Sequence, residues 1–290
     1  MFPGCLTALV TPFRDGAIDT KALAALVEEQ IASGINGLVP CGSTGESATM
    51  SHDEHLTVVR EVVRVARKRV PVIAGTGSNS TAEAIRLTRG AQELGADAAL
   101  LISPYYNKPT QDGIVRHYAA VAEATRIPLI AYNIQGRTAS NITAETMGRL
   151  ARVPRLVGVK EASGSMAQVL EILATCGPDF GVWSGDDVVT LPLMAAGGIG
   201  VISVASNVAP RRMVELSDAL RAGDLARARR VHASLMPLFR DLFLEVNPIP
   251  VKTALAIMGR CTDELRLPLT PLTAQHRAVL ETTLREQGLV

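Results

Sequence analysis

Short apolar segments alternate with longer amphipathic segments along most of the chain. The short segments are rich in Val, Ile, Leu and Ala and lack polar alternation, which is typical of strands that are buried on both faces. Eight such strands are predicted, at residues 5–10, 37–41, 72–75, 98–102, 129–133, 156–160, 181–184 and 201–204.

The segments between and after these strands carry apolar residues at the spacing of one helix face. Residues 51–54 and 80–83 both fit the S-x-x-E capping box, and Pro210 stands where a first-turn proline is tolerated. Helices are predicted at residues 20–33, 51–68, 81–94, 111–125, 143–151, 166–176, 188–196 and 210–221.

A repeated strand-then-helix order implies parallel strands joined by right-handed crossovers. Eight such units predict a TIM (β/α)8 barrel over residues 1–223, with an open sheet that has edge strands as the alternative. Past Gly223 the strand pattern stops, and three helices are predicted at residues 224–244, 250–259 and 273–286. We expect residues 224–290 to form a small helical domain that packs on the barrel, because this region contains no linker-like stretch.

The charge balance and the cysteines exclude several classes of function. The chain has 29 basic and 28 acidic residues and a net charge of +1, which gives no electrostatic case for binding nucleic acid or an acidic membrane. The N-terminus has no basic signal-peptide region and no apolar run could span a bilayer, so we expect a cytoplasmic protein. The four cysteines are scattered without a CxxC pair, and His52 and His55 lack the H-E-x-x-H pattern. We therefore expect neither a metal nor a cofactor.

Lys160 is the strongest candidate for chemistry, because it stands at the end of a strand that is predicted to be buried. One interpretation is that its side chain projects into solvent. The other is that apolar surroundings hold the ammonium, which lowers its pKa and yields free amine near neutral pH. A free amine attacks carbonyl carbons and forms a Schiff base.

Polar residues follow most of the other predicted strands, and in a barrel these positions share one mouth. Their concentration there favours the reactive interpretation of Lys160. The turn at residues 42–45 is either a cradle of N–H groups for a carboxylate or phosphate or an ordinary strand-to-helix turn, and it lacks the P-loop spacing. Asp186 and Asp187 are interpreted as loop hydrogen-bond acceptors rather than a cation site, because adjacent side chains diverge.

Six motifs occur in the order of a known family. Together they resemble the dihydrodipicolinate synthase / N-acetylneuraminate lyase family over nearly the whole chain. The resemblance implies a TIM barrel with a C-terminal helical domain, assembled as a homotetramer of two tight dimers. The motifs are Gly42-Ser43-Thr44-Gly45-Glu46-Ser47, Pro104-Tyr105-Tyr106-Asn107-Lys108-Pro109, Tyr132-Asn133, Gly158-Val159-Lys160-Glu161-Ala162, Ser184-Gly185-Asp186-Asp187 and Asn247-Pro248-Ile249-Pro250-Val251-Lys252.

The resemblance implies catalysis by Schiff-base chemistry. Lys160 would form the imine with pyruvate, which then condenses with L-aspartate 4-semialdehyde in the biosynthesis of lysine and diaminopimelate. Thr44, Tyr132 and Tyr106 would form a proton relay, with Tyr106 donated across the tight-dimer interface. Tyr132 would be the acid or base nearest the imine, and its pKa should be depressed beside that cation.

The resemblance also implies the residues that bind the two substrates. Ser43 and Thr44 would hold the pyruvate carboxylate, Arg137 would face the carboxylate of the semialdehyde, and Gly185 and Ile202 would present main-chain carbonyls near the lysine. Ser43 is often threonine in the synthases and is serine in some lyases, whereas Arg137 favours a synthase. Gln135-Gly136 replaces the usual Pro-x, which predicts a looser backbone before Arg137.

Two other functions fit the same residues. One is another pyruvate-dependent aldolase that acts on a sugar acid, and the other is a non-catalytic barrel that binds a 2-oxo acid as a sensor. An assay of the aldehyde substrates separates the two enzymes, and trapping of a pyruvate adduct separates enzyme from sensor.

The resemblance further implies feedback inhibition by L-lysine at a second site on the tight-dimer interface. The ligand needs an anion for its α-ammonium, donors for its carboxylate and acceptors for its far ammonium. The alternative is that Glu83 only completes its capping box and that the histidines are solvated. The matching residues in this chain are His52, His55, Asn79, Glu83 and Tyr105.

Overall fold

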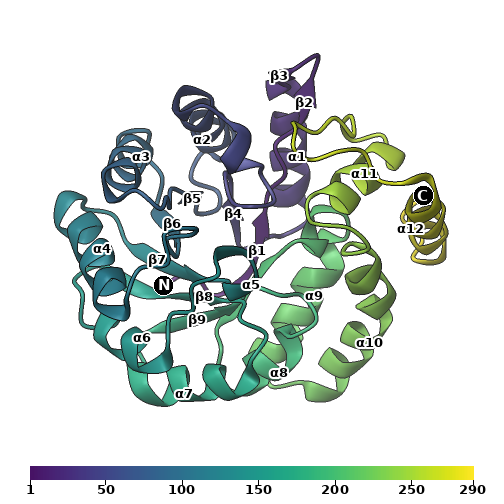
Figure 1. The fold of residues 1–290 in the computed structure, drawn as a ribbon. Helices are drawn as coiled ribbons and strands as arrows, with labels where there is room; N and C mark the ends of the chain where they lie inside the picture. The colour runs from purple at the N-terminus through teal and green to yellow at the C-terminus, as the bar shows by residue number, and fades with distance from the viewer.

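A computed structural model describes all 290 residues. Its centre is a single sheet of eight parallel strands with the hydrogen-bonded order β4-β1-β10-β9-β8-β7-β6-β5 (Figure 1). A parallel bridge between Leu38 and Val72 joins the two ends of this order, so the sheet closes on itself. The predicted barrel is confirmed and the open sheet is wrong. The strands are β1 (Gly4–Ala8), β4 (Gly37–Val39), β5 (Ile73–Gly75), β6 (Ala98–Ile102), β7 (Leu129–Asn133), β8 (Leu156–Glu161), β9 (Gly181–Ser184) and β10 (Gly200–Ser203).

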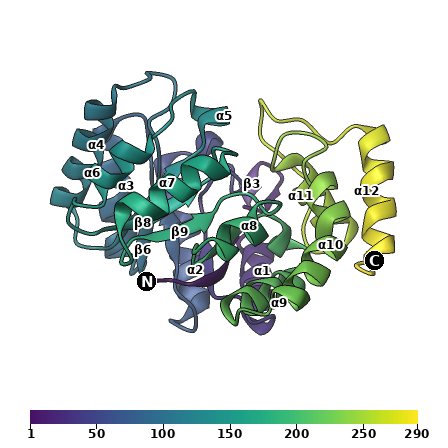
Figure 2. The ribbon, with the colours of Figure 1, turned by 90° about the horizontal axis from the view of Figure 1, so that it is seen from below.

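Helices surround the barrel on its outside, as the two ribbon views show (Figures 1 and 2). Each predicted helix of the barrel is present, with ends within about two residues of those expected from the pattern. These helices are α1 (Thr20–Ala32), α2 (His52–Ala66), α3 (Thr81–Glu93), α4 (Gln111–Ala124), α6 (Ala144–Leu150), α7 (Met166–Cys176), α8 (Thr190–Ala195) and α9 (Pro210–Arg221).

Five short elements were not predicted from the sequence. Most of them lie in the connections that follow strands, at the level of the barrel mouth. Each is too short to show a hydrophobic period. They are β2 (Phe13–Arg14), β3 (Ala17–Ile18), η1 (Ser47–Thr49), α5 (Gln135–Thr138) and η2 (Ala205–Asn207).

The hydrophobic core has two layers. Sixty-three buried residues fill the space between the strands and the helices and continue into the C-terminal helices. A smaller cluster of ten, which includes Leu6, Ile130, Trp183 and Ile202, fills the barrel itself. Because both faces of each strand are buried, the strands read as continuous apolar runs in the sequence.

Three further helices follow the barrel: α10 (Leu225–Asp241), α11 (Ile249–Ile257) and α12 (Ala274–Glu286). Figure 2 shows them together on one side, beyond α9. Helix α10 packs against α9 and α8, and α12 packs against α10 and α11. None of the helices in the structure is both long and apolar enough to cross a membrane.

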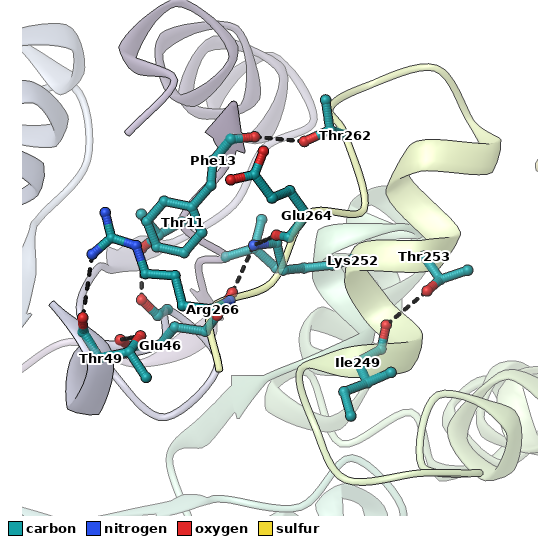
Figure 3. A network of polar contacts seen from close by, with 12 residues as sticks. Thr11, Phe13, Glu46, Thr49, Ile249, Lys252, Thr253, Thr262, Glu264 and Arg266 are labelled. Carbon is teal, nitrogen blue, oxygen red and sulfur yellow. Dashed lines mark hydrogen bonds and ion pairs between the residues drawn. The ribbon is translucent and has the colours of Figure 1, made fainter. Parts of the chain in front are cut away.

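A buried ion pair ties α11 to the barrel (Figure 3). The side chains of Lys252 and Glu46 are both fully buried, with 2.6 Å between Nζ and Oε1. The Lys252 ammonium also lies 4.4 Å from the ring centroid of Phe13, and the Arg266 main-chain N–H donates to Glu46 Oε2 at 3.1 Å. Glu46 directly follows the Gly42–Gly45 turn and has a positive φ of 53°. The C-terminal segment therefore fixes the backbone at the end of this turn.

We predict that Lys252→Met lowers the free energy of unfolding by about 3–5 kcal/mol, because it leaves the Glu46 carboxylate buried without its partner. Adding Glu46→Gln should restore part of this loss. The matched control is Lys68→Met, which removes an exposed pair with Asp97 and should cost less than about 1 kcal/mol. Urea unfolding at one fixed protein concentration measures all three variants. Equal losses for Lys252→Met and Lys68→Met would refute the role of burial.

Candidate active site

The Lys160 side chain lies at the carboxyl end of β8 and is only 5% exposed. Its Nζ lies 4.3 Å from the ring centroid of Tyr132, which occupies the paired position on β7. Burial lowers the pKa of Lys160 to about 8, while the nearby Asp187 carboxylate acts in the opposite direction. The interpretation that Lys160 projects into solvent is therefore wrong, and free amine is available near neutral pH.

Gly185 directly follows β9, and Ile202 lies on β10, the next strand of the sheet beyond β9. A Cβ atom at Gly185 would stand 3.1 Å from Lys160 Cε and 2.7 Å from the Cβ of Ala162, so glycine leaves the room that the lysine side chain occupies. The side chain of Ile202 is fully buried in the same barrel cluster as Tyr132. Gly185 therefore lies beside the Lys160 side chain, and Ile202 lies inside the barrel with Tyr132.

Tyr132 is buried, and burial raises its pKa to about 12. The Arg137 charge and a hydrogen bond with the Ser43 side chain act in the opposite direction but are outweighed. Without substrate, Tyr132 therefore does not have the depressed pKa that is expected beside a cationic imine. The tyrosine stays protonated here and is ready to donate.

The Gly42–Gly45 turn presents unused donors. The N–H groups of Ser43 and Thr44 make no hydrogen bond to another protein group. A Cβ at Gly45 would stand 3.1 Å from both Cys41 N and Leu9 O, so the tight turn leaves little room for a side chain there. The Thr44 hydroxyl is buried and accepts a hydrogen bond from Asn247 Nδ2 at 3.0 Å. Two free N–H groups side by side suit a carboxylate.

Arg137 lies in α5, directly after β7, and its Nη2 donates to the main-chain oxygen of Asn247 at 2.8 Å. A Cβ at Gly136 would meet nothing within 4 Å, so the glycine is not required by packing. A hydrogen bond to the C-terminal segment therefore holds the Arg137 side chain, and packing around Gly136 does not.

Tyr106 does not join Thr44 and Tyr132 within one chain. Its side chain is 88% exposed and its φ is positive, at 70°. The preceding residue, Tyr105, instead lines a cavity of about 440 Å³. Of the three residues assigned to the relay, two are buried in the barrel mouth and the third lies on the surface.

This cavity brings together four of the five residues assigned to a lysine site, and Ser43 and Arg137 also line it. The fifth, Asn79, is not in its lining; the Asn79 main-chain oxygen accepts from Asn107 Nδ2 at 2.9 Å. The four are His52, His55, Glu83 and Tyr105.

Two parts of the alternative interpretation do not hold: His55 is not solvated, and the exposed Glu83 does not complete its capping box. His55 is buried, its Nε2 lies 2.6 Å from Gly75 O, and burial lowers its pKa, so the ring is neutral and Nε2 donates. Its Nδ1 is then an acceptor. Ser80 caps α3 as predicted, but the Glu83 carboxylate accepts from Ser78 Oγ at 2.7 Å and does not complete the box. The equivalent box at Ser51 and Glu54 is complete.

The two aspartates after β9 are hydrogen-bond acceptors, as predicted. Asp187 Oδ2 accepts from the N–H groups of Val204 and Ala205 at 3.1 and 2.8 Å, and Asp186 Oδ1 accepts from Val188 N–H at 3.1 Å. Burial raises the pKa of Asp187 to about 6. The sequence argument missed that this carboxylate acts on Lys160, and it missed Asn247, which the motif contained without any sign of its contacts.

The sequence model of the dihydrodipicolinate synthetase family matches residues 1–287. This chain belongs to that family. The 4-hydroxy-tetrahydrodipicolinate synthase of Geobacter sulfurreducens is 54% identical over the full length of both chains. The enzyme of the same name from Nitratidesulfovibrio vulgaris is 56% identical over all of this chain and 99% of its own.

Solved structures of the family have the same fold. The dihydrodipicolinate synthase of Acinetobacter baumannii, in complex with pyruvate, has a TM-score of 0.98 at 46% identity, with both chains fully covered. The enzyme of Cyanidioschyzon merolae, with lysine bound, has a TM-score of 0.97 at 41% identity and covers all of this chain and 99% of its own. In this chain the buried Lys160 amine, the Tyr132 ring beside it and the free N–H groups of the Gly42–Gly45 turn make the barrel mouth the candidate active site.

We predict that the free-amine fraction of Lys160 rises with pH and reaches one half at about pH 8, against about 10.4 for an ordinary lysine. Competitive acetylation across a pH series, read by peptide mass, measures it. Asp187→Asn should shift the midpoint to lower pH, because the carboxylate that favours the ammonium is gone. A wild-type midpoint near 10 would contradict the burial argument.

Proposed function

We propose that this chain condenses pyruvate with L-aspartate 4-semialdehyde to give 4-hydroxy-tetrahydrodipicolinate, in the biosynthesis of lysine and diaminopimelate. The support is that relatives matching the full length of this chain are named for this reaction. The observation that carries the proposal is the buried Lys160 amine beside the Tyr132 ring. An amine with a lowered pKa is the group that Schiff-base catalysis requires.

The reaction follows from the chemistry of an imine. The Lys160 amine adds to the ketone carbon of pyruvate and water leaves, which gives a protonated imine. This electron sink lets the methyl group lose a proton, so an enamine forms. The enamine carbon attacks the aldehyde carbon of the second substrate, whose amine then adds to the imine carbon, closes the ring and releases Lys160.

Each of these steps moves a proton, so hydroxyl groups within hydrogen-bond reach are required. We assign this relay to Thr44, Tyr132 and Tyr106, with Tyr132 as the acid or base nearest the imine. The high pKa of Tyr132 before substrate binds suits a donor that is deprotonated only when the cation forms beside it.

The substrate carboxylates have two separate candidate partners. The free N–H groups of Ser43 and Thr44 support the first, for pyruvate. Arg137, which lines the open cavity, supports the second, for the semialdehyde. The main-chain carbonyls of Gly185 and Ile202 complete the surroundings of the imine.

We infer that the active unit is a dimer within a homotetramer built as a dimer of tight dimers, in the cytoplasm. The support is Tyr106, whose side chain is exposed on its own chain and is available to a second copy. Residues 1–223 would be the catalytic barrel and residues 224–290 a helical domain that contributes contacts to the site.

The two remaining candidates are a sugar-acid aldolase and a 2-oxo-acid sensor. Arg137 favours the synthase over the sugar-acid aldolase, because a guanidinium pairs with a carboxylate through two parallel hydrogen bonds. Turnover of pyruvate with aspartate semialdehyde, compared with turnover with sugar aldehydes, decides between the two enzymes.

We predict that pyruvate and borohydride add one reduced pyruvate to Lys160 and inactivate the protein. The mass of the whole chain and of the Lys160 peptide measures the adduct. Lys160→Arg should give none, because a guanidinium stays protonated. A label on Lys252, or no label on the wild-type protein, would argue against the mechanism.

Tyr106→Phe should lower kcat by about 10²-fold or more, as expected for the loss of a positioned proton donor. If the residue serves a partner, hybrids of Tyr106→Phe with Lys160→Ala should regain part of the activity, since one mouth of each hybrid dimer is then intact. Hybrids are isolated with two affinity tags and assayed. Verified hybrids without any regain would mean that Tyr106 acts in its own chain.

We also propose that L-lysine inhibits the enzyme from the cavity lined by His52, His55, Glu83 and Tyr105. The relative with lysine bound shows that the family contains lysine-binding members. Glu83 would pair with the α-ammonium, the Tyr105 hydroxyl would donate to the carboxylate, and the free His55 Nδ1 would accept from the far ammonium. Asn79 would join them from the start of α3. Tyr105 precedes Tyr106, so occupancy would disturb the relay.

The expected result is partial inhibition of the wild-type protein by millimolar L-lysine, which Glu83→Ala abolishes while kcat is kept. Initial rates at saturating pyruvate, with and without L-lysine, measure it. Glu93→Ala, near the far end of α3, is the matched control and should leave inhibition unchanged. Wild-type activity that is insensitive to lysine would exclude the site.

A further inference from the structure

Asn247 contacts two of the residues proposed to act on the substrates. It lies between α10 and α11, is 6% exposed and lines the same cavity as Ser43 and Arg137. Its side-chain Nδ2 donates to Thr44 Oγ1 at 3.0 Å, and its main-chain oxygen accepts from Arg137 Nη2 at 2.8 Å. Its Oδ1 has no protein partner, so the donor end of the amide is the one held to the turn.

The Thr44 hydroxyl has one proton to give and two lone pairs. The Asn247 amide occupies one lone pair, and the hydroxyl makes no other hydrogen bond to the protein. Its proton is therefore not taken up by a structural contact. A hydroxyl that relays protons needs this arrangement, in which one hydrogen bond fixes its oxygen and its own proton is free to be donated.

The segments that carry Asn247 and Thr44 are joined by a second contact, the Lys252–Glu46 ion pair. Thr44 stands two residues before Glu46, and Asn247 stands just before α11, which carries Lys252. The buried Lys252–Glu46 pair joins these two segments at 2.6 Å (Figure 3). The position of the amide relative to the hydroxyl is thus set before substrate binds.

We propose that Asn247 is a positioning residue that acts through Thr44: its amide donates to the Thr44 hydroxyl and so directs the hydroxyl proton away from residue 247, where it is free for transfer in the relay. The proposal rests on the proposed function, because it gives a direction to the relay assigned there. The main-chain contact with Arg137 does not depend on the side chain of residue 247, so the two roles are separable by mutation.

The test uses two variants of the full chain with similar side-chain size. Asn247→Leu removes the donor without adding charge, and Asn247→Asp replaces it with a group that only accepts when ionised. Both should lower kcat by at least about tenfold, as expected when positioned proton transfer is impaired, with little change in KM for either substrate. Exchange of the pyruvate methyl protons with deuterated solvent, followed by NMR, should slow by a similar factor.

The deciding measurement is the combination with Thr44→Val. If Asn247 acts through Thr44, the double variant Thr44→Val/Asn247→Leu is no slower than Thr44→Val alone, because the hydroxyl to be directed is already absent. A merely structural asparagine would multiply the two losses. Asn36→Ala, which removes a partly buried amide contact at the opposite end of the barrel, is the control and should change stability without this pattern.

Normal kcat and exchange in Asn247→Asp would overturn the proposal, since an acceptor would then serve as well as a donor. Multiplied losses in the double variant would overturn it too. If Asn247→Leu fails to fold, Asn247→Ala takes its place in the same cycle. Borohydride trapping of pyruvate on the wild-type protein distinguishes failure of the proposed function from failure of the Asn247 proposal. If no adduct forms, both fail. If an adduct forms and both variants turn over normally, only the Asn247 proposal is refuted.

Discussion

Closure of the barrel is the constraint on which the site depends. The strands that carry or precede the candidate residues are far apart in the sequence, and they share a mouth only because β4 and β5 meet through the bridge between Leu38 and Val72. In an open sheet of this order β4 and β8 would be separated by three strands along a flat row, whereas in the closed barrel their ends face each other across one mouth. Closure also removes the edges of the eight-stranded sheet, so no barrel strand presents a row of unpaired main-chain groups.

Burial at the mouth of a closed, apolar barrel disfavours the ionised form of a side chain. Burial lowers the pKa of Lys160, and the Asp187 carboxylate raises it again, with about 8 as the result. Asp187 is itself buried and held by two main-chain N–H groups from the loop after β10. The reactivity of the amine therefore depends on the neighbouring strands as much as on the strand that carries it.

The C-terminal helices are part of this site and not only a cover on the barrel. The buried Lys252 ammonium forms an ion pair with the buried Glu46 carboxylate, and Asn247 forms hydrogen bonds with both Thr44 and Arg137. Since a buried ion pair is costly unless its geometry is well satisfied, these contacts favour one placement of α11 against the Gly42–Gly45 turn. A single segment thus links the stability of the C-terminal region to the geometry of the barrel mouth.

The sequence by itself determined the order and type of the long elements, because a strand buried on both faces and an amphipathic helix leave distinct periods. It also singled out Lys160, since a lysine after a buried strand is unusual. It could not find α5 or the β2–β3 hairpin, which are too short to show a period. It equally could not distinguish the complete capping box at Ser51 from the partial one at Ser80, where Ser78 binds the carboxylate instead. Only the tertiary structure decided the pKa of Lys160, the exposure of Tyr106 and the contacts of Asn247, because burial and long-range hydrogen bonds depend on residues that the chain brings together from distant positions.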